Sequence, residues 1–217
     1  MMVAILQFPG TNCERDMQYA YSNILGVKSV IVWHKQKNLP SETDLVVIPG
    51  GFSYGDYLRS GAIARFAPIM KDVISYAANG GLVLGICNGF QILTESGLLP
   101  GVLKRNEGLC FISKTQKLEV TGVNNRFLSN YKHKEIISLP IAHADGSYYA
   151  DSDTLKSLKE NDQILLRYVG NPNGSVYSIA GICNKEKNIF GLMPHPERAI
   201  EPILGGSDGL AMLRSLL

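Results

Sequence analysis

Several features that would assign this sequence to a class of protein are missing from it. No apolar run approaches the roughly 18 residues that a membrane-spanning helix needs, so we expect no membrane partner. The net charge is only +2, which is too small to indicate a nucleic-acid surface. The segment Met1-Met2-Val3-Ala4-Ile5-Leu6-Gln7-Phe8 lacks the basic start of a signal peptide and predicts a first β-strand instead.

Cysteine is scarce as well. The four cysteines, Cys13, Cys87, Cys110 and Cys183, lie far apart, and no pair has the spacing of a zinc site or a redox motif. We therefore expect no metal, and a reducing cytoplasm is the natural compartment. A phosphate-binding loop of the common kind is also missing, because no Gly-Lys-Ser/Thr follows the Gly-rich segment 50–55.

The composition that remains is typical of a soluble enzyme, with 45% apolar and 18% charged residues. A chain of 217 residues can bury a full core, and no linker or repeat divides it, so we expect one domain over residues 1–217. The first half alternates strand and helix, which predicts a parallel sheet with helices on both faces. The expected strands are 3–8, 29–33, 45–48 and 82–86, and the expected helices are 14–25, capped by Thr11 or Asn12, and 62–78.

The second half has a different pattern, in which short apolar runs are joined by turns. We expect some of these strands to be antiparallel, followed by a last helix that Ser207-Asp208 caps. The expected strands are 117–123, 135–141, 164–169, 176–180 and 189–192, and the last helix is 209–217.

The segment Gly85-Ile86-Cys87-Asn88-Gly89 joins the strand 82–86 to a helix-like run. Its Gly-x-nucleophile-x-Gly spacing is typical of a nucleophile elbow, with sulfur in place of oxygen. A helix N-terminus pointed at Cys87 favours thiolate, and the N–H of Asn88 can stabilise an oxyanion. The alternative is a small buried cysteine without a chemical role.

A base for such a nucleophile is present in Met193-Pro194-His195-Pro196-Glu197-Arg198. His195 and Glu197 are two positions apart, and the flanking prolines exclude a regular helix, so both side chains can face one cleft. His143 competes with His195 by residue type, but it lacks an acidic neighbour held by prolines. The alternative for the whole motif is a surface histidine beside a glutamate.

Glycines also follow the strand 45–48, in Pro49-Gly50-Gly51-Phe52-Ser53-Tyr54-Gly55-Asp56. Glycine lets backbone N–H groups approach a ligand closely, and Gly51 is our candidate for a second oxyanion donor. An ordinary Gly-rich turn is the alternative.

In this order, Pro-Gly-Gly, Gly-x-Cys-x-Gly-x-Gln and His-Pro-Glu resemble the motifs of the class I (triad) glutamine amidotransferases. Further stretches resemble the branch of that family that forms the glutaminase subunit of a synthetase in de novo purine synthesis. They are Phe8-Pro9-Gly10-Thr11-Asn12-Cys13, the Phe-Ser-Tyr-Gly-Asp run at 52–56, Asn171-Pro172-Asn173-Gly174-Ser175 and Ile179-Ala180-Gly181-Ile182-Cys183-Asn184.

The resemblance implies a flavodoxin-like α/β fold, with a mostly parallel sheet flanked by helices and extra antiparallel strands in the second half. It implies Cys87 as nucleophile, His195 as base, Glu197 as its orienting group, and the N–H groups of Gly51 and Asn88 as the oxyanion hole. Gln91 matches a position near bound L-glutamine.

The resemblance further implies that ammonia passes to a large synthetase subunit, which would use ATP and Mg²⁺, and that a small accessory subunit joins the complex. No cofactor is expected on this chain. One departure is visible: the family usually shows Gly-Glu-Gly-Arg after Ala-His, whereas this chain has Ala144-Asp145-Gly146-Ser147. The acid there is one methylene shorter and the basic residue is missing. A cysteine peptidase, a silent binding subunit and a glutaminase of another pathway, such as that of guanylate, are the alternative functions.

Overall fold

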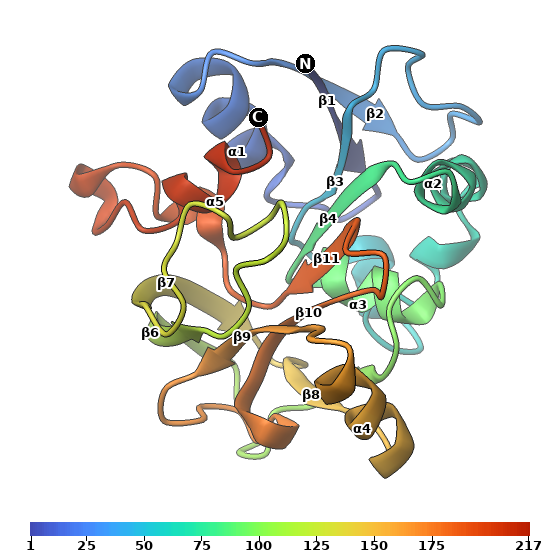
Figure 1. Cartoon of the computed structure of the whole chain (residues 1–217). Helices are drawn as coiled ribbons and strands as arrows, with labels where there is room; N and C mark the ends of the chain where they lie inside the picture. Colours follow the sequence, from blue (N-terminus) through green and yellow to red (C-terminus); the bar gives the residue numbers. More distant parts are fainter.

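The computed structural model describes residues 1–217 and is built around a nine-stranded sheet (Figure 1). Its strand order is β2-β1-β3-β4-β11-β10-β9-β6-β7, and a separate two-stranded sheet pairs β5 with β8. The strands are β1 (Met2–Gln7), β2 (Lys28–Trp33), β3 (Leu45–Ile48), β4 (Leu82–Ile86), β5 (Val102–Lys104), β6 (Ile112–Val120), β7 (Ile136–His143), β8 (Ser147–Tyr149), β9 (Ile164–Tyr168), β10 (Ile179–Cys183) and β11 (Ile189–Leu192).

Five strands form the parallel half of the sheet, in the order β2-β1-β3-β4-β11. This order matches the 2-1-3-4-5 order of flavodoxin-like folds when β11 is counted as the fifth strand. Strands β1, β3 and β4 consist almost wholly of buried aliphatic residues, as expected of parallel strands covered on both faces. The remaining strands β10, β9, β6 and β7 are antiparallel to their neighbours. The predicted fold class is therefore confirmed.

The helices cover the parallel half on both faces. Figure 1 shows α1 and α5 on one side of these strands and α2 and α3 on the other. The helices are α1 (Glu14–Tyr19), which continues as a π-helical turn over Ala20–Ile24, α2 (Pro68–Ala78), α3 (Asn88–Glu95), α4 (Ser152–Glu160) and α5 (Leu210–Arg214). No helix is both long enough and apolar enough to cross a membrane.

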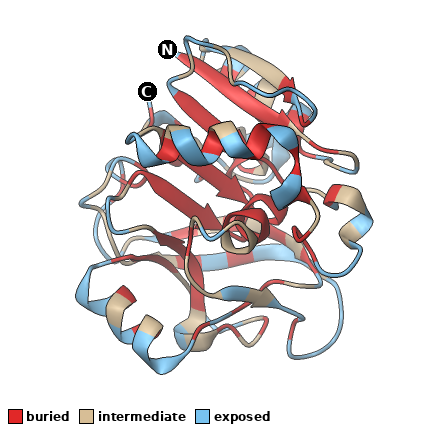
Figure 2. Ribbon diagram, turned by 90° about the vertical axis from the view of Figure 1, so that its right-hand side faces the viewer, coloured by how far each residue is buried: buried red, intermediate tan, exposed pale blue.

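One contiguous apolar core lies between the sheet and these helices and contains 57 buried residues. In Figure 2 the buried residues concentrate on the strands, while α2 in front carries exposed residues on its outer side. Strands from both halves of the sheet contribute to the same core, so the antiparallel strands extend the parallel half rather than forming a separate layer.

The structure differs from the sequence-based prediction at several helix ends. The expected helix 62–78 is divided, because Ala67 before Pro68 adopts an extended conformation (ψ 142°) and α2 starts at the proline. The predicted caps of two other helices are wrong, because both side chains have other partners. Thr11 Oγ1 accepts from the Phe8 N–H, and Asp208 Oδ2 accepts from the Ser138 N–H.

Three elements were not predicted, namely β5, β8 and α4. Helix α4 has a recognisable signal, since Asp151 caps it by accepting from the Thr154 N–H at 2.8 Å, and Leu155 and Leu158 form its buried face. The expected strand 176–180 is also shifted, because residues 176–178 form a 3₁₀ turn before β10.

Candidate active site

The carboxyl ends of four parallel strands bring the predicted motifs together. Cys13 lies beyond β1, Gly51 beyond β3, Cys87 directly after β4, and His195 beyond β11. These ends meet at one edge of the sheet, which is where open α/β folds bind their ligands. The backbone joins two of them directly, because the N–H of Cys13 donates to the carbonyl of Gly50 at 3.1 Å.

The segment around Cys87 is a sharp strand-to-helix turn. Cys87 has φ +51° and ψ −106° and immediately precedes α3. A β-carbon at Gly89 would lie 1.8 Å from the Ile48 carbonyl oxygen, and one at Gly85 would lie 2.4 Å from Leu93 Cδ1. Helix α3 can thus approach the sheet only because both glycines flank the cysteine. The predicted elbow is confirmed in its backbone geometry, including the strained conformation of its central residue.

The thiol of Cys87 is nearly buried and faces the last strand of the antiparallel half. Its Sγ lies 3.7 Å from the Ala142 carbonyl oxygen, in β7. Its N–H donates to the Leu192 carbonyl at 2.7 Å, which fixes the elbow against β11. Both halves of the sheet therefore position the candidate nucleophile.

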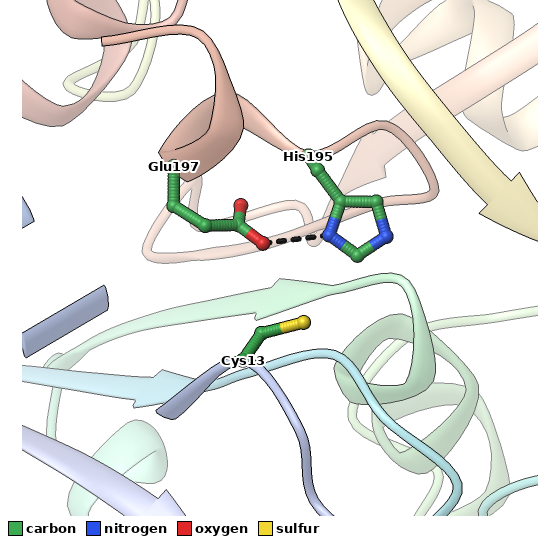
Figure 3. A group of neighbouring side chains, drawn as sticks. All are labelled: Cys13, His195 and Glu197. Carbon is green, nitrogen blue, oxygen red and sulfur yellow. Dashed lines mark hydrogen bonds and ion pairs between the residues drawn. The ribbon is translucent and has the colours of Figure 1, made fainter. Parts of the chain in front are cut away.

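The imidazole of His195 is held by Glu197, as predicted. Figure 3 shows the Glu197 carboxylate facing Nδ1, and the distance from Oε1 to Nδ1 is 2.6 Å. Both side chains are buried, at 2% and 0% exposure. A backbone bond from the His195 N–H to the Pro140 carbonyl, 2.8 Å long, ties the segment to β7. The bond to Glu197 occupies Nδ1, and the other ring nitrogen, Nε2, has no hydrogen-bond partner in the chain.

Electrostatics favours a protonated His195. Burial alone would lower the pKa of this imidazole, but the neighbouring Glu197 carboxylate and Cys87 thiolate outweigh it and raise the pKa well above its ordinary value. An imidazolium beside the sulfur favours a resting ion pair over a neutral thiol and imidazole.

Cys87 and His195 line one cavity of about 130 Å³. Gly51 lines the same cavity, so the candidate nucleophile, base and second oxyanion donor surround one space. Gly51 has φ +150°, and a β-carbon there would lie 2.6 Å from the Asn12 nitrogen. Only glycine fits this close approach of two backbone segments.

The side chains of Asn88 and Gln91 brace the site from within. Asn88 Oδ1 accepts from the Ser53 N–H at 3.0 Å, and its Nδ2 donates to Gln91 Oε1 at 2.8 Å. Gln91 Nε2 donates to the Asp145 carbonyl at 2.7 Å. Gln91 lies at the wall of a second, smaller cavity beside Cys87, but both ends of its amide already have partners. A contact between Gln91 and substrate stays a prediction.

Sequence reasoning gave Cys13 no place in the site. Figure 3 shows its thiol beneath the His195 ring, and Arg198 Nη2 donates to its Sγ at 3.0 Å. Ligand atoms of Cys13, His195 and Glu197 lie within 4.8 Å of one another, so the three could in principle hold a metal ion. However, His195 Nδ1 and Glu197 Oε1 bond to each other and Arg198 donates to the Cys13 sulfur, so one candidate ligand atom of each residue already has a partner within the chain.

The smaller cavity contains further residues that the sequence did not assign. It shares Gly51, Phe52, Cys87 and Ala142 with the first cavity, and its other lining residues are Asp56, Ser60, Gln91, His143, Ala144 and Asp145. Asp56 belongs to a strained turn in which its own φ is +55°. Positive φ at a non-glycine residue often marks a functional site, but it is invisible in a sequence.

Three polar side chains outside the triad, those of Tyr54, Arg59 and Arg198, are bonded within the chain. Tyr54 Oη lies 2.6 Å from His34 Nδ1. Arg59 makes two bonds to Glu95, of 2.5 and 2.6 Å, and Arg198 donates to Cys13. These contacts give each side chain a structural role.

The fold and the site together indicate a hydrolase with a candidate cysteine nucleophile, a buried His-Glu pair and a candidate oxyanion hole. Comparison with known families agrees, since the CobB/CobQ-like glutamine amidotransferase domain matches residues 1–205. The chain belongs to this glutamine amidotransferase family.

Individual relatives are similar over their whole length. Phosphoribosylformylglycinamidine synthase subunit PurQ of Wolinella succinogenes is 67% identical over 217 residues, covering 100% of this chain and 99% of the relative. The protein of the same name from Helicobacter hepaticus is 64% identical, covering 100% of this chain and 97% of its own. Among solved structures, PurLQS from Thermotoga maritima superposes with a TM-score of 0.91 and 41% identity, covering 99% of this chain and 96% of that one.

Proposed function

We propose that this chain is the glutaminase subunit of a phosphoribosylformylglycinamidine synthase. It hydrolyses L-glutamine to glutamate and ammonia, and the ammonia is used to convert formylglycinamide ribonucleotide to formylglycinamidine ribonucleotide in de novo purine (IMP) biosynthesis. The main support for glutaminase activity is the cavity that Cys87 and His195 line together, where Glu197 orients His195. The full-length similarity to PurQ relatives carries the identity of the acceptor.

The first half of the reaction forms a thioester. The Cys87 thiolate attacks the carboxamide carbon, and the carbonyl oxygen becomes an oxyanion beside the backbone N–H groups of Gly51 and Asn88. Losing one such donor typically costs about 10²–10³ in rate. His195 then gives its Nε2 proton to the leaving nitrogen, the carbon–nitrogen bond breaks, and ammonia departs.

The second half returns the site to its starting state. A water molecule gives a proton to the neutral His195 and attacks the thioester carbonyl. The carbon–sulfur bond breaks, glutamate leaves, and the Cys87 thiolate and the His195 imidazolium are restored. No step in this half needs a metal or an organic cofactor from this chain.

The ammonia is consumed on other subunits in this proposal. A large synthetase subunit activates the amide oxygen of the ribonucleotide with ATP and Mg²⁺, and a small accessory subunit completes the complex. The likeness to PurLQS of Thermotoga maritima supports a complex with two further components, L and S. We expect little hydrolysis by the isolated chain, because an unregulated glutaminase wastes glutamine.

The test is glutamate release by wild type and Cys87→Ala, with and without the synthetase subunits, ATP and formylglycinamide ribonucleotide. Activity that needs both Cys87 and the nucleotide supports the whole proposal. Activity that needs Cys87 but ignores the nucleotide points to another acceptor, and activity without Cys87 overturns the triad. Cys110→Ala is the matched control, because Cys110 is exposed and is not among the residues that line the cavity, and should leave activity unchanged.

A further inference from the structure

His143 is a buried histidine that the reaction described above does not use. It ends β7, lines the smaller cavity together with Cys87, and is 3% exposed. Its Nε2 has no hydrogen-bond partner in the chain. A buried polar atom without a partner is costly, so one that lines a cavity beside a nucleophile points to a ligand as its missing partner.

The neighbouring Asn106 determines which nitrogen of His143 carries the proton. Asn106 Nδ2 donates to the carbonyls of Cys110 and His143, at 2.9 and 2.8 Å, so its Oδ1 must be the atom that faces the ring. This oxygen lies 3.0 Å from His143 Nδ1 and also accepts from the Gly146 N–H. An acceptor opposite Nδ1 requires a proton on Nδ1, and the lone pair is therefore on Nε2.

The ring is also neutral near pH 7. Burial, together with the charge of the nearby His195, lowers the pKa of His143 to about 4. His143 thus offers the cavity a fixed acceptor and no donor, unlike His195, whose proton is used in the reaction.

Two carboxylates line the same cavity without a cationic partner. No nitrogen of lysine or arginine lies within 4.0 Å of Asp56 or Asp145. Asp145 Oδ2 accepts from Ser60 Oγ at 2.9 Å, and Asn88 Nδ2 lies 3.4 Å from Asp56 Oδ1. Burial, with a further contribution from Asp145, raises the pKa of Asp56 to about 6. The cavity wall therefore combines unpaired negative charge with a bare nitrogen acceptor.

We propose that His143 and Asp145, with Asp56 beside them, bind the α-ammonium group of the amino-acid substrate while its carboxamide faces Cys87. An ammonium group has a positive charge and three N–H donors. It therefore complements a cavity wall that offers negative charge and hydrogen-bond acceptors. The two cavities share Cys87 and Ala142, so one molecule can reach from the candidate oxyanion hole to these acceptors. The inference rests on the proposed glutaminase activity and makes His143 and Asp145 specificity-determining residues.

The experiment compares L-glutamine with glutaramate, which is the same amide without the α-amino group, in the complete synthase. We expect His143→Phe and Asp145→Asn each to lower kcat/KM for glutamine about 10- to 100-fold, mainly through KM, and to leave kcat/KM for glutaramate unchanged. His133→Phe is the matched control, because His133 is exposed, and should change neither value. Equal losses on both substrates would overturn the proposal.

Two further measurements keep the result interpretable. Alkylation of Cys87 by uncharged iodoacetamide should proceed at the wild-type rate in both variants, which shows that the triad is intact. If His143→Phe does not fold, the isosteric Asp145→Asn alone decides. Ammonium chloride is also tested as a competitive inhibitor. If Asp145→Asn abolishes this inhibition but leaves the preference for glutamine over glutaramate unchanged, the site binds the product ammonium instead. That result would overturn the proposal. Because hydrolysis is measured, the outcome does not depend on which nucleotide accepts the ammonia.

Discussion

Glu197 Oε1 lies 2.6 Å from Nδ1 of His195, and the only other polar atom of that ring, Nε2, has no partner in the chain. The carboxylate therefore fixes both the rotation of the ring and the position of its protons. A buried carboxylate that accepts from Nδ1 leaves Nε2 as the nitrogen that can exchange a proton with the sulfur.

Replacing Glu197 by glutamine should test this relationship directly. The amide of Glu197→Gln can donate to Nδ1 and thereby favour the wrong tautomer, while burial of His195 is no longer opposed by the carboxylate, so its pKa falls. We expect kcat for glutamate release to fall about 10³–10⁴-fold, as with the equivalent change in other triads. Steady-state kinetics of the complex is the measurement. Glu186→Gln, at an exposed position, is the control, and a loss below tenfold in Glu197→Gln would contradict the assigned role.

The raised pKa of His195 also predicts how the stability of the chain depends on pH. An unfolded histidine titrates near 6.5, whereas the folded-state pKa of His195 lies well above that value. The stabilisation is fully present below the unfolded pKa and is lost as the pH rises through the folded pKa, at about 1.4 kcal/mol for each unit of difference.

Urea unfolding of wild type and His195→Gln at several pH values provides the check. We expect the difference in free energy of unfolding between the two proteins to be largest at about pH 6 and to shrink as the pH increases. A difference that stays constant over this range would mean that the imidazole is neutral in the folded protein.

Gly89 should be intolerant of even the smallest side chain. In Gly89→Ala the new carbon would lie 1.8 Å from the Ile48 carbonyl oxygen, so α3 must move away from the sheet. We expect a loss of about 1–3 kcal/mol in the free energy of unfolding or more, together with loss of Cys87 reactivity. Gly108→Ala is the matched control, because nothing lies within 4 Å of its β-carbon, and should change stability by less than about 0.5 kcal/mol. Similar stability of the two variants would refute this explanation of the elbow.

Much of the fold follows from the sequence because its strongest signals are local. Strands such as β3 and β4 are short aliphatic runs bounded by turn residues, and their predicted bounds match the structure. Helix caps were predicted poorly, because a side chain such as Asp208 has a competing long-range partner, the Ser138 N–H, that no local pattern reveals.

The residues of the candidate site likewise fall into those that the sequence could suggest and those that it could not. Cys87, His195 and Glu197 each sit in a motif whose spacing has a chemical reason, so the sequence was sufficient to suggest them. Cys13 and Asp56 have no such spacing, and their proximity to the triad arises from strand order and from a strained turn. His143 was considered only as a rival base, because its value as an acceptor depends on Asn106, 37 residues away.

The position of β11 between β4 and β10 has a consequence for how the protein is made. The ribosome completes β4 and the nucleophile early, but the strand that covers the open edge of β4 is among the last to be synthesised. Until then the hydrogen-bonding edge of a buried aliphatic strand has no neighbour, which is a recognised hazard for aggregation. The same delay means that Cys87 and His195 come together only when β11 has paired with β4, so we expect incomplete chains not to hydrolyse glutamine.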